Sequence, residues 1–142
     1  MQGGLSFITS SNWMYPALEV AHITGIALML GSLVLVELRV WGYAAALPAP
    51  ALASAGLRLT VGGFLLVGAS GLLMFAAHPG ELLANRAFVL KMGLVMLAGL
   101  NALGFHMRGS MAKADAWARA QTALSLGLWL GVIICGRWIA YQ

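Results

Sequence analysis

Two ionisable side chains, Glu19 and His22, lie in the apolar segment YPALEVAHITGIALML near the start of the chain. They are three residues apart, so on a helix they share one face. An ionisable group at the centre of a membrane span costs about 2.5–3.5 kcal/mol on insertion scales, and such residues are therefore candidates for function. An imidazole and a carboxylate in this position suggest a bound cofactor or metal ion.

A second histidine, His78, ends the next apolar segment and is predicted to return to the same side of the membrane. Imidazoles from two antiparallel helices, small residues such as Gly25 and Gly71 beside them, and a basic group, Arg137, are the parts of a b-type haem site. At 1.5 Å per residue, His22 should lie about 8–10 Å deeper than His78. A shared haem would have to be tilted, or the second helix would have to extend past its predicted end.

Other polar residues complete the set of candidates. Glu19 would support the site by accepting the other imidazole N–H of His22 or by lying near the propionates. His106 ends the third apolar segment about 15 Å from the depth of His22, so it is an alternative metal ligand or an interface residue. Lys91 is predicted to snorkel to the headgroups, and Asn101 to bridge two helices by hydrogen bonds.

The elements that must position these residues are apolar. The chain has 142 residues, of which 61% are hydrophobic and 8% charged, so we expect one domain, 1–142, with the bilayer as its solvent. Four segments are long enough to span, at residues 15–41, 57–77, 88–107 and 117–141. Pro48 and Pro50 are expected to stop the first helix, and Ser54 to cap the second. Short connections predict an all-α fold, an integral membrane four-helix up-down bundle.

The distribution of basic residues predicts the orientation. One side receives the larger set, which is Arg39, Arg58, Arg108, Lys113 and Arg119, and the other side receives Arg86, Lys91 and Arg137. The positive-inside rule then places both termini outside the cytoplasm. Because the positive charges flank apolar segments, the net charge of +4 indicates lipid headgroups and no nucleic acid.

Glycine is frequent within the spans, with 18 residues in the chain. Small residues at three- and four-residue spacing allow membrane helices to approach closely, which accounts for most of them as bundle packing. Gly127 and Gly131 form a GxxxG pattern that could also serve another subunit. We therefore expect partners to be other membrane subunits or further copies of this chain.

Two stretches, LEVAHITGIALMLGSLVLVELRVWG and NRAFVLKMGLVMLAGLNALGFH, together with the short loops, resemble a family of small bacterial four-helix inner-membrane proteins of unassigned function. That family is distantly similar to CopD-like copper-resistance membrane proteins and to small cytochrome b subunits. The resemblance implies a multi-pass protein of the bacterial inner membrane with periplasmic termini. The positions that match recurrent polar residues of the family are His22, Arg39, Asn85, Lys91, Asn101 and His106. His78 is not at such a position.

The function predicted from these residues is a membrane electron-transfer subunit that binds haem b in the outer half of the bundle. Its site residues are His22, His78, Arg137 and Glu19, with His22 and His78 as iron ligands. The alternatives are a copper-handling protein that binds copper through Glu19, His22 and a methionine at the periplasmic face, and a cofactor-free structural subunit. The sequence contains no Ser-His-Asp set, phosphate loop or zinc motif, so we expect no independent catalysis.

Overall fold

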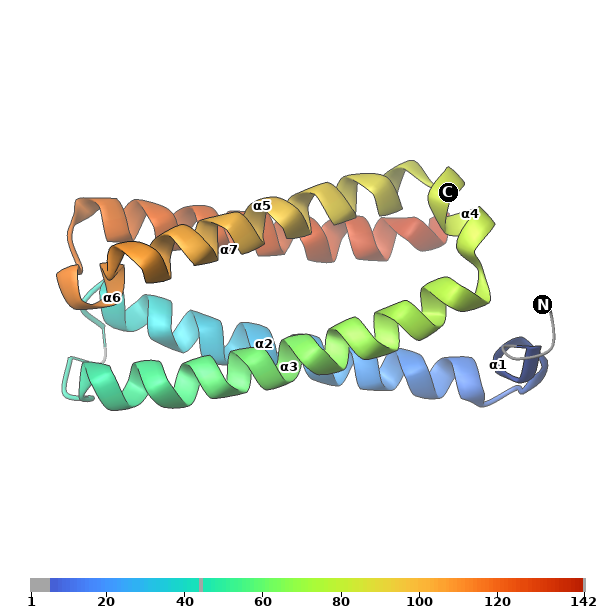
Figure 1. Cartoon of the computed structure of the whole chain (residues 1–142), viewed down its shortest axis with the longest axis horizontal. Coiled ribbons are helices and arrows are strands. Elements are labelled where there is room, and N and C mark those ends of the chain that lie inside the picture. Colours follow the sequence, from blue (N-terminus) through green and yellow to red (C-terminus); the bar gives the residue numbers. More distant parts are fainter. Residues whose placement is uncertain (1–5, 44, 142) are drawn as a thin grey trace.

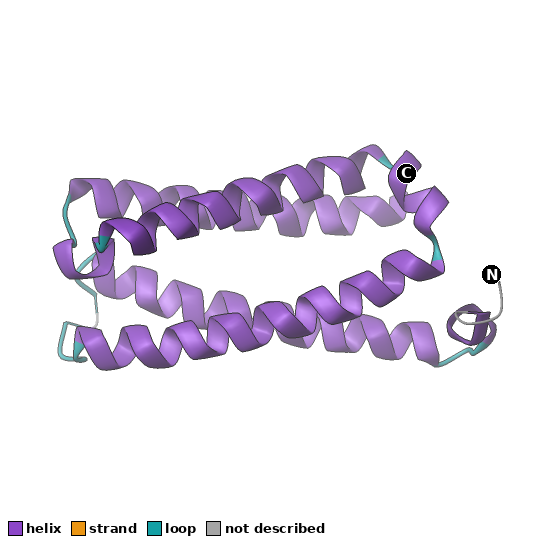
Figure 2. Ribbon diagram, in the orientation of Figure 1, coloured by secondary structure: helices purple, strands orange, loops and turns teal. Residues whose placement is uncertain are grey.

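The chain is helical over almost all of residues 6–43 and 45–141, which are the residues described by the computed structural model (Figure 2). Four helices are long and apolar enough to cross a membrane: α2 (Met14–Val40), α3 (Ala49–Ala77), α5 (Arg86–Arg108) and α7 (Ala116–Trp138), the last extended by the 3-10 turn η1 (Ile139–Tyr141). Short helices α1 (Ser6–Ser10), α4 (Pro79–Ala84) and α6 (Ser110–Lys113) lie at their ends. The prediction of an all-helical chain with four apolar helices is confirmed.

Helix α3 begins at Ala49, earlier than the predicted start at residue 57. Pro48 is its N-cap, in an extended conformation, and Pro50 lies in the first turn. Proline is tolerated there because the first N–H groups of a helix have no intrahelical acceptor. The two prolines therefore start this helix, and the prediction that Ser54 caps it is wrong.

The ends of α5 and α7 are capped by local chemistry. The Asn85 side chain accepts hydrogen bonds from the backbone N–H groups of Ala87 and Phe88, at 3.0 and 3.3 Å, and its amide donates to the Ile139 carbonyl at 3.0 Å. Asn85 thus starts α5 and ties it to the end of α7. Gly109 ends α5 with a φ of 69°, a left-handed conformation that glycine adopts without strain.

Asp115 caps α7 and forms an ion pair with Arg108 across the α6 connection. The Arg108 guanidinium beside Asp115, together with the hydrogen bond from the Ala118 N–H, lowers the pKa of this carboxyl below its ordinary value. A lowered carboxyl pKa contributes stability that is present above the unfolded-state pKa and is lost as the pH falls through the folded-state pKa.

We therefore expect acidification below the ordinary titration range of aspartate to destabilise the α5–α7 connection. The measurement is the unfolding midpoint in detergent as a function of pH for the wild type and for Asp115→Asn. Asp115→Asn should no longer show this loss of stability at acidic pH. Glu81→Asn, an exposed substitution at the opposite end of the molecule, should still show it. Identical pH profiles for the wild type and Asp115→Asn would contradict the assignment.

Helices α2 and α3 form a first hairpin whose seam is built from small residues. Facing residues advance along both helices in alternating three- and four-residue steps, the spacing of a coiled-coil seam. The pairs are His22 with Ser70, Gly25 with Val67, Met29 with Gly63, Ser32 with Thr60, and Val36 with Gly56. A Cβ at Gly63 would lie 2.7 Å from the Met29 backbone nitrogen, so the glycine is what permits this approach.

Helices α5 and α7 form a second hairpin with a different seam. Leu94 packs over Gly131, and the Asn101 amide donates to the Gln121 carbonyl at 2.8 Å. The expected interhelical role of Asn101 is thereby confirmed. Gly127 has open space where its Cβ would stand, so only one glycine of the GxxxG pattern, Gly131, is in the seam.

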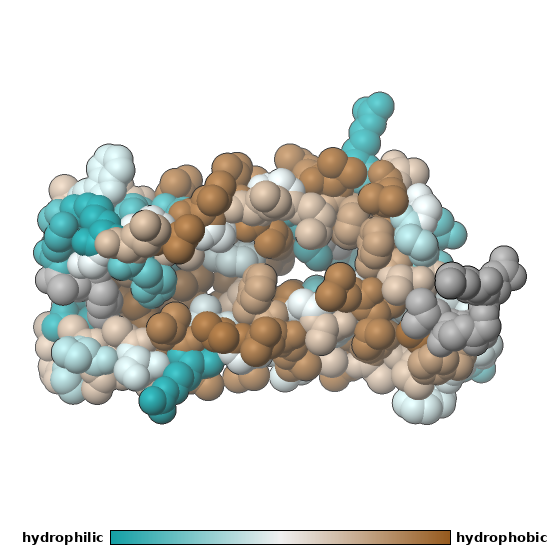
Figure 3. Space-filling model, in the orientation of Figure 1, coloured by the Kyte–Doolittle hydropathy of each residue, from teal (hydrophilic) through white to brown (hydrophobic). Residues whose placement is uncertain are grey.

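The two hairpins make their closest contacts at their ends (Figure 1). At the end that carries α6, called here the α6 end, Trp41 Nε1 donates to Thr122 Oγ1 at 2.8 Å, and Val40 packs with Phe105 and Ala118. At the other end, which carries α4 and is called the α4 end, Phe75 stacks on Phe88 with ring centroids 5.7 Å apart. Between these ends the hairpins diverge, and the space-filling view shows an opening there (Figure 3).

Candidate functional site

His22 lies in the first hairpin, where α3 holds its ring in place. Its Nδ1 is 3.0 Å from Ser70 Oγ, and the Ser70 hydroxyl is itself anchored to the Leu66 carbonyl at 2.7 Å. The ring packs against Gly71, where an added Cβ would lie 3.3 Å from its Cε1. The side chain that the sequence singled out is thus half-buried in a membrane-length helix, and one of its two ring nitrogens is engaged.

Lys91 of α5 lies close enough to His22 to interact with it electrostatically across the space between the hairpins. Its ammonium group is near α7, 3.8 Å from the position that a Cβ on Gly136 would occupy. Lys91 is half-buried, and its stem packs against the neighbouring helix. Packing against Gly136 is possible because glycine leaves room for the long lysine stem.

His78 is placed at the α4 end, away from His22. It follows the last residue of α3, its ring contacts the edge of Tyr15 at 5.7 Å, and its Nδ1 is 3.7 Å from a Glu81 carboxylate oxygen. Tyr15 precedes His22 by seven residues on α2, which corresponds to about 10 Å of helix rise. The two imidazoles therefore lie at different depths, as the sequence predicted, and each has its own partners.

The other predicted site residues do not converge on His22. Arg137 is exposed, and its guanidinium donates to the Tyr141 hydroxyl at 3.0 Å and lies over the same ring. Glu19 is exposed and close enough to Tyr15 to interact with it electrostatically. His106 is exposed at the α6 end, with its ring edge against Phe105. Among the described residues, no group of three or more His, Cys, Asp or Glu side chains is arranged to hold a metal ion.

A buried carboxyl that the sequence reasoning did not single out is Glu37, which is only 7% exposed. It lies on the face of α2 toward α7, with its carboxyl close to the Ser125 hydroxyl. The sequence places it two residues before Arg39 at the end of a span, where charged residues commonly face headgroups. Only the packing of α7 on α2 shows that the Glu37 side chain is enclosed. In the sequence, Glu37 could have been noticed as an acidic residue within an apolar segment.

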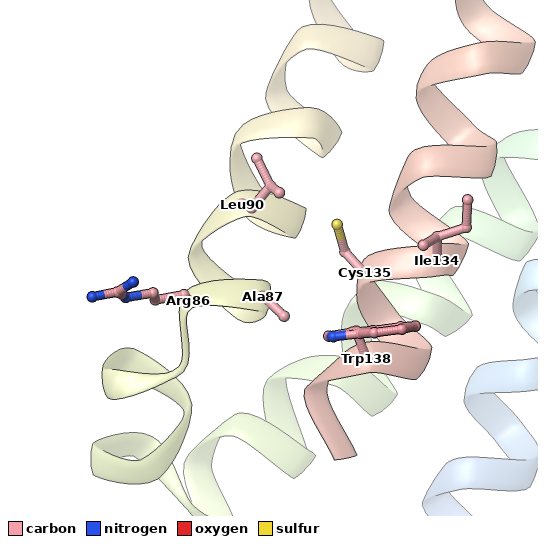
Figure 4. A pocket seen from close by; sticks show the side chains of 6 residues that line it. All are labelled: Arg86, Ala87, Leu90, Ile134, Cys135 and Trp138. Carbon is pink, nitrogen blue, oxygen red and sulfur yellow. The ribbon is translucent and has the colours of Figure 1, made fainter. Parts of the chain in front are cut away.

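A shallow apolar groove lies between α5 and α7 at the α4 end (Figure 4). It is lined by Arg86, Ala87, Leu90, Ile134, Trp138 and the buried Cys135. The groove contains no histidine and lies apart from His22. Its lining provides contacts for apolar chains and offers no set of metal-binding groups.

No protein-family model, curated protein or solved structure matches this chain. The likeness to CopD-like proteins and to small cytochrome b subunits stays a prediction from the sequence.

Proposed function

We propose that this chain is a single-domain integral membrane protein that crosses the bacterial inner membrane as an up-down four-helix bundle. Its four long helices expose large apolar side chains along their length, for example Leu65, Leu72 and Leu130. Such surfaces are unfavourable in water and are suited to lipid. The brown band of apolar residues along the helices in Figure 3 is the surface expected to contact acyl chains.

In this proposal the α6 end is cytoplasmic and the α4 end is periplasmic. The α6 end carries most of the basic residues, among them Arg108, Lys113 and Arg119, which favours that orientation. The exposed Lys113 offers a labelling position: Lys113→Cys in a Cys135→Ser background should react with an impermeant maleimide only after the cells are opened. Reaction in intact cells would reverse the orientation.

We further propose that the protein is an electron-transfer subunit that holds a b-type haem with His22 as an axial ligand. The observation that supports this is the Ser70 contact at Nδ1. A hydrogen bond at one imidazole nitrogen fixes the ring orientation and tautomer and leaves Nε2 to bind a metal. A haem supplies four nitrogens of its own and needs only one or two protein ligands, so a single oriented imidazole suits it.

The geometry changes the roles proposed for the neighbouring residues. His78 is held at a different depth by Tyr15 and Glu81, so we propose His22 alone as the ligand from this chain. Lys91 replaces Arg137 as the basic group near the site, because it interacts with His22 whereas Arg137 is bound to Tyr141. When bound, the haem would exchange single electrons, and the chain would orient it and exclude water.

The experiment is an absorption spectrum of the purified protein combined with metal analysis. A Soret band with stoichiometric iron supports the haem proposal. Copper without a Soret band would replace it by copper handling. Absence of both, after expression with haem and copper supplied, would leave the structural-subunit function.

A further inference from the structure

Glu37 stands at the junction of the two hairpins. At 7% exposure it is the only acidic side chain among the buried residues of the described chain. Its carboxyl reaches from α2 to Ser125 of α7, one turn from the Trp41–Thr122 hydrogen bond. Val40, three residues after Glu37 on α2, packs with Phe105 and Ala118 in an apolar cluster. The carboxyl thus lies in one of the few places where the hairpins touch.

The charged groups around this junction are engaged elsewhere. On α2, Arg39 donates to the Leu47 carbonyl at 3.1 Å. On α7, the Arg119 guanidinium lies over the Trp41 ring, 5.9 Å from its centroid. On α3, Arg58 is exposed, and on α5, His106 is exposed and contacts Phe105. Within the described residues, no basic group forms an ion pair with Glu37.

A carboxylate in such surroundings has one hydroxyl partner and no counter-charge. Burying an ionised carboxylate without a paired cation is far more costly than burying its neutral acid, which can also donate a hydrogen bond. Ionisable residues inside membrane spans commonly mark sites that bind protons or ions. A hydroxyl such as that of Ser125 can accept from the acid or donate to the carboxylate, so it serves both states.

We propose that Glu37 is a proton-binding site that controls the contact between the two hairpins. With the proton bound, the neutral carboxyl donates to Ser125 and α2 stays packed on α7. When the O–H bond breaks, the proton leaves to water at the α6 end and a carboxylate remains. That carboxylate draws water into the junction, and the hairpins separate there. This proposal is independent of the ligand role of His22.

Infrared difference spectra of the full chain in nanodiscs, between acidic and alkaline pH, test where the proton is bound. The wild type should lose a protonated-carboxyl carbonyl band as the pH rises. Glu37→Gln should lack that band, and Ser125→Ala should shift it without removing it. Glu19→Gln is the matched control on the same helix, because Glu19 is exposed, and it should leave the band unchanged. A band that persists in Glu37→Gln would overturn the proposal.

Distances between spin labels test the conformational part. Labels at Leu59 of α3 and Leu103 of α5, both exposed, should move apart on alkalinisation in a Cys135→Ser background. Glu37→Gln, which keeps a neutral hydrogen-bonding side chain, should retain the shorter distance at every pH. If Glu37→Gln does not fold, the label distance in Ser125→Ala tests the proposal. In Ser125→Ala the two hairpins should separate at a lower pH than in the wild type. A label distance that does not change with pH in the wild type would overturn the proposal.

Discussion

Replacing Gly63 by alanine should destabilise the folded protein by about 1–3 kcal/mol, the range expected for overpacking a tight contact. The added Cβ would lie 2.7 Å from the Met29 nitrogen and 2.8 Å from the Gly25 carbonyl oxygen. Both are backbone atoms, so no side-chain rotation relieves the clash and the two helices must move apart. The free energy of unfolding in mixed detergent micelles measures the effect.

Gly62 provides the matched control. It is the preceding residue of the same helix, and an added Cβ there meets nothing within 4 Å. Gly62→Ala should leave stability unchanged or raise it slightly, because alanine favours the helix over glycine by about 0.5–1 kcal/mol. Equal effects of the two substitutions would show that α2 and α3 do not pack through this seam in the folded protein.

Loss of bound haem is the expected result of His22→Ala, with insertion and helix content retained. The imidazole is the only proposed iron ligand from this chain, so its removal should eliminate the Soret band from the purified protein. His78→Ala should keep the band, because His78 lies at a different depth with Tyr15 and Glu81 as partners. The measurement is haem content per protein after purification.

Ser70→Ala should weaken haem binding by about 10–100-fold, the usual effect of removing a residue that orients a metal ligand. Ser32→Ala is the control, since Ser32 makes a similar hydroxyl contact in the same seam, 2.8 Å from Thr60, away from His22. If His22→Ala keeps the bound haem and His78→Ala loses it, the iron ligand is His78. Equal losses in the two serine variants would assign the effect to seam packing.

The sequence predicted the helices well and their contacts poorly. His78 follows the last residue of α3, as predicted, and it contacts Tyr15, seven residues before His22 on α2. The start of α3 was harder to predict, because Pro48 and Pro50 are compatible both with stopping one helix and with starting the next. Whether a proline stops one helix or starts the next depends on the conformation of the backbone around it, which the sequence does not give.

For the candidate site, too, the sequence predicted the positions of residues along the helices better than their contacts. Arg137 was expected near the haem propionates because it lies in the outer part of its segment, but its guanidinium is bound to Tyr141 one turn further along. Depth follows from position in a segment, whereas direction depends on the rotation of the helix about its axis. Glu37 was overlooked for the same reason, because only the orientation of α2 relative to α7 encloses it.

By itself the sequence determined the number of membrane-length helices, their approximate limits, the short connections and the depth of His22. These properties depend on runs of about 20 apolar residues, which each segment carries regardless of its neighbours. Only the tertiary structure decided that Ser70 holds His22, that Lys91 comes within electrostatic range of it, and that Glu37 lies close to Ser125. The helices are apolar on all sides, so hydropathy does not select a packing face. Close contacts at Gly25, Gly56 and Gly63 set the rotation and register of α2 against α3, which bring Ser70 to His22.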